Sequence, residues 1–356
     1  MSNFTFNLHT IKLGAISMFC ASFALPLYPA QSLNEKLKTA LYKAPYIVCI
    51  DGGGSKTELQ ILDNTGKLVP ISKNGAQQPS CSAGSSNINT VGIAGIEKAL
   101  TELFDGVEIE GAPLAKMTEN CAVIAGFSGG AQPEAKEAIL HKHGFAQPKI
   151  VVASDAGIAS QLIEQNGILL IAGTGSIVIA RKDGKEVHIG GLGRLIGDEG
   201  SGYTLGKKAI KAALEDEQGY GKTTALTQLL KTHFNVSKVQ NVISPIHQGT
   251  ITPPGVAAVA RLVFEQEEQD KVATELIDET ARELGEQIAM AIQKTTLKKE
   301  NLYLVGGLFK SKNVNKFIDK IKKHAPLEGW TITNIAHENA TTRVVQKVIK
   351  DTAGNF

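Results

Sequence analysis

Short apolar runs recur along the chain from residue 46 onward, separated by glycine turns and by segments with apolar residues at helical spacing. Residues 46–50 are apolar and end at Asp51-Gly52-Gly53-Gly54, which predicts a buried strand entering a tight turn. The next segments predict in turn a strand, a helix, a strand, a helix, a strand and a helix, at residues 58–62, 90–104, 121–125, 134–141, 149–153 and 156–165. Strands joined by crossover helices favour a mixed sheet of the α/β class.

The same pattern begins again in the middle of the chain. When Gly54-Ser55 is aligned with Gly175-Ser176, the apolar strand, the glycine turn, the second strand and the Gly-Lys turn after it all coincide. This predicts a duplicated unit: two similar α/β domains that each begin with a glycine-turn hairpin. We expect the first domain at residues 45–155 and the second at 156–340. The remaining predicted elements are helical insertions at 201–214 and 256–294, a strand at 302–305, a helix from Lys312, and a last helix at 341–350, where residues 341–356 can cross back onto the first domain.

Residues 1–44 are predicted to form a leader outside this fold, either signal-like or disordered. Residues 13–27 are mostly apolar and follow Lys12, and Ser22-Phe23-Ala24 offers a small-x-small cleavage pattern. The stretch is too short for a confident membrane span. The alternative is an apolar extension that never crosses a membrane, because little positive charge precedes it.

Composition places the chain among ordinary globular proteins. Its 356 residues exceed what one core usually contains, and 42% of them are hydrophobic while 20% are charged. The 37 basic and 35 acidic side chains leave a formal charge of +2 without a long basic run, so we expect no nucleic-acid partner. The four cysteines form no CxxC pair, and Cys49 and Cys121 lie in apolar runs, which predicts buried thiols and neither a disulfide framework nor a zinc site.

The two glycine turns are candidates for binding a polyphosphate. Successive glycines lack side chains, so their N–H groups can converge on a phosphate oxygen, and neighbouring hydroxyl groups add donors. The residues concerned are Gly52, Gly53, Gly54 and Ser55 in the first turn, and Thr174, Gly175 and Ser176 in the second. One such turn alone is more simply explained as a tight turn, but two of them can clamp a phosphate chain from both sides.

Acidic residues beside these turns are candidates for the chemistry. Asp51 precedes the first turn, where its carboxylate can hold Mg²⁺ or cap the turn. Asp155 follows a predicted strand at the junction of the two domains, where it can take a proton from an acceptor hydroxyl or cap the next helix. Asp198 and Glu199 lie in residues 190–202, whose six glycines predict a loop that approaches a small polar ligand. These carboxylates can bind sugar hydroxyls or cap the following helix.

Five motifs in this order along the chain resemble those of the N-acetylglucosamine kinase family. They are residues 51–57 (DGGGSKT), 84–87 (GSSN), 154–157 (SDAG), 172–176 (AGTGS) and 190–202 (GGLGRLIGDEGSG). That family is related to the ATPases that activate benzoyl-CoA reductase, and both belong to the superfamily of sugar kinases, heat-shock chaperone ATPases and actin. The similarity extends from about residue 46 to the C-terminus, and Leu192 stands where sugar-kinase relatives can carry an aromatic side chain.

The resemblance implies two ribonuclease-H-like domains, with a helical insertion in the second and with ATP-Mg²⁺ and a sugar in the cleft between them. By this resemblance Ser55 and Thr174 contact the nucleotide, and the Gly306-Gly307 turn lies near the adenosine. The positions that match sugar-contacting ones are Asn87, Asp155, Ser176, Gly191, Leu192, Gly193 and Asp198. Asp155 also matches the proposed general base.

The function expected from these residues is ATP-dependent phosphorylation of N-acetylglucosamine, at its 6-hydroxyl group. Glucosamine, N-acetylmannosamine and N-acetylmuramic acid stay open as acceptors. The alternatives are an ATPase that activates a reductase or dehydratase, against which the scattered cysteines argue, and a sugar sensor without catalysis. A kinase needs ATP, so we expect a cytoplasmic protein, with export or membrane tethering through residues 1–30 as the alternative. A homodimer stays open.

Overall fold

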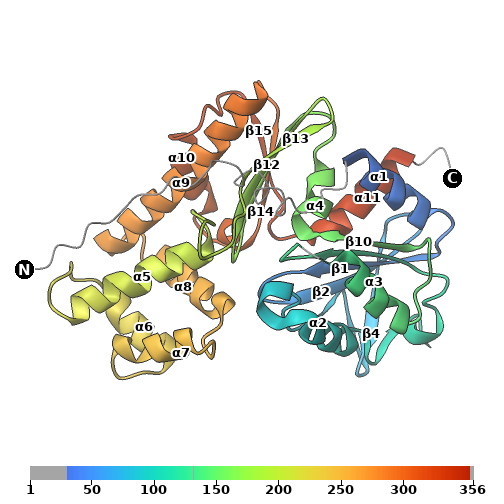
Figure 1. Ribbon diagram of the computed structural model, residues 1–356, viewed down its shortest axis with the longest axis horizontal. Helices are drawn as coiled ribbons and strands as arrows, with labels where there is room; N and C mark the ends of the chain where they lie inside the picture. Colours follow the sequence, from blue (N-terminus) through green and yellow to red (C-terminus); the bar gives the residue numbers. More distant parts are fainter. Residues whose placement is uncertain (1–29, 131, 353–356) are drawn as a thin grey trace, which may run out of the picture.

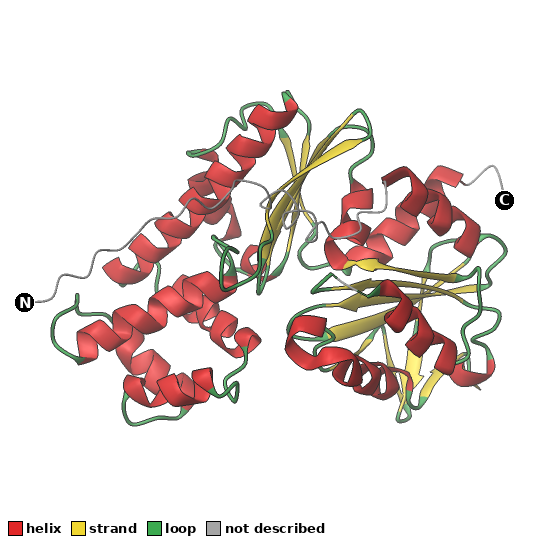
Figure 2. Ribbon diagram, in the orientation of Figure 1, coloured by secondary structure: helices red, strands yellow, loops and turns green. Residues whose placement is uncertain are grey.

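The computed structural model describes residues 30–130 and 132–352. These residues form two lobes, each built around one main β-sheet with helices packed on it (Figure 1). Strands and helices alternate in both lobes, so the predicted α/β class is confirmed (Figure 2).

The first main sheet has the strand order β10-β9-β1-β2-β3, and β6 pairs with β2. β1 is antiparallel to β2 and parallel to β9, which is parallel to β10. The strands are β1 (Tyr46–Gly52), β2 (Thr57–Asp63), β3 (Leu68–Val69), β6 (Cys81–Ala83), β9 (Ala122–Phe127) and β10 (Ile150–Ser154). A small separate sheet, unforeseen from the sequence, contains β4 (Ile71–Lys73), β5 (Ala76–Gln78), β7 (Val107–Ile109) and β8 (Ala112–Pro113).

The second main sheet repeats the first. Its order is β13-β12-β11-β14-β15, with two antiparallel pairs followed by two parallel pairs. The strands are β11 (Gly167–Ala172), β12 (Ser176–Lys182), β13 (Lys185–Gly190), β14 (Asn301–Val305) and β15 (Thr331–Asn334). Equal order and equal strand directions confirm the predicted duplication.

Helices cover both faces of the first sheet (Figure 1). One face packs on α2 (Ile88–Phe104) and α3 (Pro133–Lys142), and the other on α1 (Ala30–Leu41), α4 (Asp155–Ala159) and α11 (Ala340–Thr352). Along β1 the side chains alternate between these two cores, with Ile50 in the first and Cys49 in the second. Short 3-10 helices occur at Leu114–Lys116 and Ser160–Leu162.

The second sheet packs on the helical insertion through one face and on α4 through the other. The helices of this lobe are α5 (Gly202–Glu217), α6 (Leu226–Phe234), α7 (Ile243–His247), α8 (Pro253–Glu265), α9 (Lys271–Thr295) and α10 (Val314–Lys322), with 3-10 helices at Val239–Val242 and Gly307–Lys310. The single helical region predicted at 256–294 is divided into α8 and α9, because Asp270 caps the second helix by accepting from the N–H groups of Val272 and Ala273.

The N-terminal prediction needs a correction from residue 30 onward. Helix α1 is part of the first lobe, where Leu33, Leu37 and Leu41 are buried beside α11. These leucines are four residues apart and therefore form one apolar stripe of the helix. Residues 1–29, which include the apolar stretch and the cleavage pattern, lie outside the described residues. No helix among residues 30–352 that the structure describes combines the length and the apolar character needed to cross a membrane.

The last helix returns to the first sheet, as expected. The Thr341 hydroxyl donates to the carbonyl oxygen of Ile50 at 3.1 Å, and the Thr342 hydroxyl donates to Gln60 Oε1 at 2.7 Å. Val344, Val345 and Val348 bury their side chains against the strands. The first lobe therefore contains both the first and the last helices of the described chain.

Candidate active site

The two predicted glycine turns lie against each other, although they belong to different sheets. Ser55 Oγ and Thr174 Oγ1 are 3.2 Å apart, within hydrogen-bond distance. A Cβ atom on Gly54 would lie 3.4 Å from the Thr174 side chain. The lobes thus bring together two turns that are far apart in sequence. Their role in binding stays a prediction.

Close packing explains why glycine occupies these turns. A Cβ atom on Gly52 would overlap Ser86 Oγ and would lie 2.5 Å from the Phe127 ring. Gly306 has a φ of 109°, and its Cβ would lie 2.9 Å from the backbone nitrogen of Gly173. The Gly306-Gly307 turn therefore adjoins the second glycine turn, and its place near the adenosine stays a prediction. Any larger residue at Gly52 or Gly306 would displace the atoms that surround these turns.

Asp51 and Asp155 stand on either side of Gly126. Asp51 pairs with Gly126 across β1 and β9, and a Cβ atom on Gly126 would lie 3.1 Å from the Asp155 Cα atom. Ser154, the residue before Asp155, pairs with Phe127. Because Gly126 has no side chain, Asp155 and Ile158 of α4 can pack closely against β9 at this point. Both acidic residues thus lie at the carboxyl ends of parallel strands, where α/β sheets bind ligands.

Both carboxylates are harder to ionise than usual. Burial, the charge of Asp155 and that of Glu58 raise the pKa of Asp51 to about 6, against the lowering effects of the Ala340 N–H group and Lys56. Burial also raises the pKa of Asp155, partly offset by the Ala156 N–H group and by Lys136. The Ala156 N–H group donates to Asp155 Oδ1 at 2.8 Å. Crowded negative charge of this kind would be relieved by a cation.

Asp51 fits a Mg²⁺ ion that is shared with a nucleotide. Among residues 30–130 and 132–352, no three or more His, Cys, Asp or Glu side chains gather to form a protein-only metal site. Mg²⁺ usually keeps several waters and binds one or two carboxylates together with substrate phosphates. Asp51 fits that requirement, because it is one half-buried carboxylate with a raised pKa next to a glycine turn.

Residues 190–202 form the loop that the glycines predicted, and Asp198 is buried within it. Its Oδ1 atom accepts from the Gly193 N–H group at 3.2 Å, and its Oδ2 atom would be 2.9 Å from a Cβ atom on Gly175. Burial raises the pKa of Asp198. The second glycine turn and the carboxylate predicted to bind sugar are therefore adjacent.

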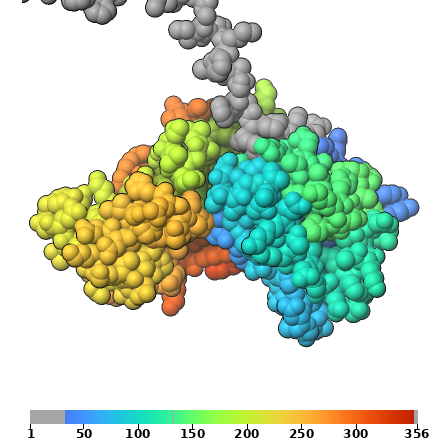
Figure 3. Space-filling model, turned by 60° about the horizontal axis from the view of Figure 1, so that its bottom comes forward, coloured from blue at the N-terminus to red at the C-terminus, as the bar shows by residue number. Residues whose placement is uncertain are grey.

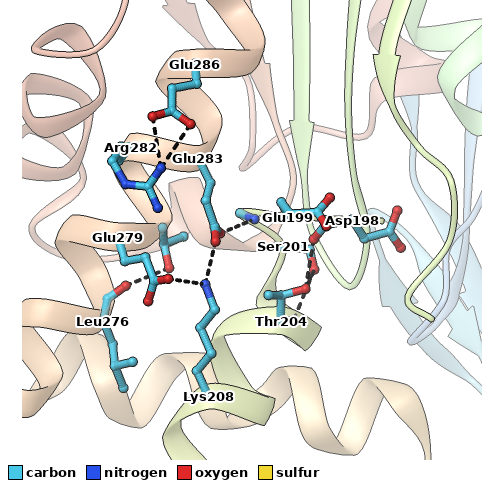
Figure 4. Close-up of polar contacts among 12 residues, drawn as sticks. Asp198, Glu199, Ser201, Thr204, Lys208, Leu276, Glu279, Arg282, Glu283 and Glu286 are labelled. Carbon is cyan, nitrogen blue, oxygen red and sulfur yellow. Dashed lines mark hydrogen bonds and ion pairs between the residues drawn. The ribbon is translucent and has the colours of Figure 1, made fainter. Parts of the chain in front are cut away.

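A polar network anchors this loop to α9 and α5 (Figure 4). The Gly200 N–H group donates to Glu283 Oε2 at 2.7 Å, and Lys208 pairs with Glu283 at 2.5 Å and with Glu279 at 3.2 Å. Gln287 donates to the carbonyl oxygen of Glu199 at 2.9 Å. Figure 4 shows Asp198 pointing away from α9, toward the other side of the loop. The network thus holds the backbone and leaves the Asp198 carboxylate free of it.

Two of the side chains that were predicted to contact the sugar form hydrogen bonds within the protein. The Ser176 hydroxyl donates to the carbonyl oxygen of Glu199 at 2.7 Å, so it supports the loop. Asn87 caps α2 by accepting from the Asn89 N–H group at 2.9 Å, and it faces Gly129. The predicted alternative that Glu199 caps α5 is wrong, because Ser201 caps that helix by accepting from the Thr204 N–H group.

Leu192 and its neighbours extend into solvent. Leu192 is 71% exposed, and Leu195 and Ile196 are 85% and 80% exposed. Gly191 and Gly193 have positive φ angles of 71° and 83°, which glycine adopts without strain. This apolar segment borders the buried Asp198. In the space-filling view, the helical insertion and the first lobe appear as two masses separated by a notch (Figure 3).

Sequence reasoning missed several residues that support the site. Lys136 of α3 is fully buried, which was visible in the sequence because it precedes Ile139 and Leu140 at helical spacing. Glu283 carried no such signal, because α5 to α8 separate it from the loop in the sequence, and the pairing of Lys208 with Glu283 depends on how α5 packs on α9. Of the cysteines in the described chain, Cys49, Cys81 and Cys121 are free and buried, as expected for the first and the last.

Comparison with known proteins identifies a matching family and several similar proteins. Residues 48–340 match the BadF/BadG/BcrA/BcrD ATPase family. A protein of Clostridium acetobutylicum named N-acetylmuramic acid/N-acetylglucosamine kinase is 31% identical over 306 residues, which cover 83% of this chain and 94% of that one. An N-acetyl-D-glucosamine kinase of Dictyostelium discoideum is 27% identical, over 74% of this chain and 86% of its own.

Solved structures agree on the fold. A candidate N-acetylglucosamine kinase from Chromobacterium violaceum superposes with a TM-score of 0.62 at 21% identity, over 86% of this chain and 99% of that one. A glucokinase of the ROK family from Streptomyces griseus superposes with a TM-score of 0.51 at 14% identity, over 86% and 99% of the two chains. The lobes described above therefore have the sugar-kinase and actin-like fold, and the chain belongs to the BadF/BadG/BcrA/BcrD ATPase family.

Proposed function

We propose that this protein is an ATP-dependent amino-sugar kinase that transfers the γ-phosphoryl group to the 6-hydroxyl group of N-acetylglucosamine. The observation that carries the proposal is the meeting of the two glycine turns beside Asp155: Ser55 and Thr174 are in contact, and Asp155 lies one strand from Asp51. The relatives from Clostridium acetobutylicum and Dictyostelium discoideum, which are named as kinases of such sugars, support the acceptor class.

In the proposed reaction, Asp155 accepts the proton of the sugar hydroxyl as its oxygen attacks the γ-phosphorus. The new bond joins that oxygen to phosphorus, the bond from phosphorus to the β,γ-bridging oxygen breaks, and ADP leaves. Burial raises the pKa of Asp155 toward the range where a carboxylate is an effective base. The Ala156 N–H group fixes the orientation of its Oδ1 atom.

The two glycine turns would hold the phosphates, so that positioning and electrostatic stabilisation supply most of the rate. Asp51 would hold the Mg²⁺ ion, which neutralises charge on the phosphates when bound. On the second lobe, Asp198 would accept hydrogen bonds from sugar hydroxyls through the oxygen that faces Gly175. The exposed Leu192 would border the same sugar.

Two other functions receive less support. An ATPase that activates a reductase would present cysteines at a surface for an iron–sulfur cluster, whereas the cysteines at 49, 81 and 121 are buried. A sensor without turnover has no use for a half-buried carboxylate with a raised pKa, such as Asp155, near the two glycine turns.

The test is ADP release by the full chain with N-acetylglucosamine, N-acetylmuramic acid, glucosamine, N-acetylmannosamine or no sugar. Turnover that depends on N-acetylglucosamine supports the proposal, and phosphorus NMR of the product locates the phosphate. Sugar-independent turnover would favour the activating ATPase, and binding without turnover would favour the sensor. A strong preference for another sugar would retain the kinase and replace the acceptor.

A further inference from the structure

Lys136 is a buried charge that the proposed reaction does not yet use. It is 1% exposed and lies on the face of α3 that packs on the first sheet. Lysine is almost never fully buried without a partner, because burying its charge is costly. In the part of the chain that the structure describes, Lys136 forms no ion pair with a carboxylate. Its burial therefore needs an explanation other than a salt bridge.

The position of the ammonium group supplies that explanation. Lys136 Nζ lies 5.4 Å from the centre of the Phe127 ring, in a cation–π contact. Phe127 ends β9 and pairs with Ser154, and the next residue is Asp155. The ammonium group therefore lies on the residue that ends β9, and the paired strand β10 ends directly before Asp155. A cation–π contact recovers only part of the cost of burial, and the negative charge of Asp155 would recover more of it.

The charges around Asp155 come from three elements. Asp51 of β1 lies across Gly126 and adds negative charge, Lys136 of α3 adds positive charge, and the Ala156 N–H group of α4 donates directly. Lys136 lowers the pKa of Asp155, and Asp155 in turn raises that of Lys136. Burial acts on both in the opposite direction, since it disfavours both charges.

We propose that Lys136 is a positioning residue for phosphoryl transfer: its ammonium group, held over the Phe127 ring, stabilises the Asp155 carboxylate that receives the proton of the sugar hydroxyl. The inference rests on the proposed function, since it assigns Lys136 a task only if Asp155 is the base. Lys136 touches neither sugar nor nucleotide in this role and acts through Asp155 alone.

The experiment compares the variants K136M and K136R with K142M, a control on the same helix. Lys142 is exposed and pairs with Glu97 at 2.7 Å, so we assign it no part in stabilising Asp155. The pH profile of kcat/KM is measured from about pH 5 to about pH 9. At low pH, kcat/KM falls as Asp155 becomes protonated; this fall is the acid limb of the profile. In K136M we expect the midpoint of the acid limb to move up by about one pH unit. At a pH below that midpoint, kcat/KM of K136M should therefore be about tenfold lower than that of the wild type. K136R and K142M should keep the limb where the wild type has it.

Thermal unfolding gives a readout that needs no turnover. Asp155 has a raised pKa in the folded state, so the stability it contributes is present at low pH and is lost as pH rises through that pKa. In K136M this loss of stability should extend to higher pH. In the D155N background, the K136M substitution should not change how the unfolding temperature depends on pH in the acid range. At pH values below the pKa of Asp155, K136M should unfold no earlier than the wild type, because the buried charge that it removes has no ionised partner there.

Three results would overturn the inference. The acid limb of kcat/KM could stay in place in folded K136M, or it could move equally in K142M. The third is that K136M changes the pH dependence of the unfolding temperature equally with and without Asp155. If K136M does not fold, K136Q takes its place in both measurements. Failure of the proposed function looks different: wild-type protein would then show no sugar-dependent turnover, while the unfolding comparison would still decide whether Lys136 stabilises the Asp155 carboxylate.

Discussion

Replacing Glu283 by alanine should loosen the loop that carries Asp198. The Glu283 carboxylate accepts from the Gly200 N–H group at 2.7 Å and pairs with Lys208 at 2.5 Å. Gly200 is buried, so alanine would leave its N–H group without an acceptor, whereas Lys208 would retain Glu279 at 3.2 Å. Loss of a hydrogen bond to a charged acceptor costs about 1.5–3 kcal/mol, and loss of a partly exposed ion pair costs up to about 1 kcal/mol. We therefore expect the free energy of unfolding to fall by about 2–4 kcal/mol.

Two further variants separate these contributions. E283Q keeps an oxygen that can accept from Gly200 and loses only the ion pair, so its cost should be near 1 kcal/mol, as for other partly exposed pairs. E286A is the matched control on the same helix, because Glu286 pairs with Arg282 at the surface, with side chains 58% and 44% exposed (Figure 4). Its cost should stay below about 0.5 kcal/mol.

The assays are urea unfolding and ADP release with the sugar varied at saturating ATP. Because the loop carries Asp198, E283A should raise the KM for the sugar about tenfold with a smaller effect on the KM for ATP. The reasoning is refuted if E283A is as stable as E286A, or if E283Q is as harmful as E283A. Equal increases of both KM values would mean that the loop does not act on the sugar alone.

Three other outcomes are expected. D155N should lower kcat by about 10²–10⁴ while sugar binding persists, and a near-native rate in that variant would remove Asp155 from the mechanism. The pKa of Asp51 is raised to about 6, so the ionisation of Asp51 lowers the stability of the fold as pH rises through that value. At neutral pH and without Mg²⁺-ATP, D51N should therefore be more stable than the wild type by up to about 3 kcal/mol, measured by chemical denaturation. G52A should lose about 1–3 kcal/mol through overlap with Ser86 and Phe127, whereas G54A, which meets Thr174 at an ordinary distance, should lose less in the same assay.

Much of the fold was predictable because its strands are continuous apolar runs next to glycine turns. The strands β1 and β11 were found in this way, and their alignment revealed the duplication. Strand β13 was not predicted, because its residues are only half-buried on both faces and show no alternation. Helix α1 was assigned to the leader because it follows an apolar segment, although its leucines repeat at helical spacing.

The candidate site was predictable only as far as the main chain determines it. The glycine turns and the acidic residues after strands could be located, because their positions follow from local sequence. The hydroxyl of Ser176 could not be assigned, because the acceptor that it bonds, the carbonyl oxygen of Glu199, is fixed by the path of a separate loop. The contact between Lys136 and Phe127 likewise depends on how α3 packs on the sheet.

The return of α11 to the first sheet has a consequence for biosynthesis. The bond from Thr341 to Ile50 joins residues 291 positions apart, and the Ala340 N–H group lowers the pKa of Asp51. A ribosome releases the strands of the first lobe long before it makes this helix, so the apolar face beneath α11 remains open until translation is nearly complete. A nascent chain that stops short of residue 340 would thus lack both that cover and the bond from Thr341 to Ile50, and it would be exposed to aggregation and to chaperones.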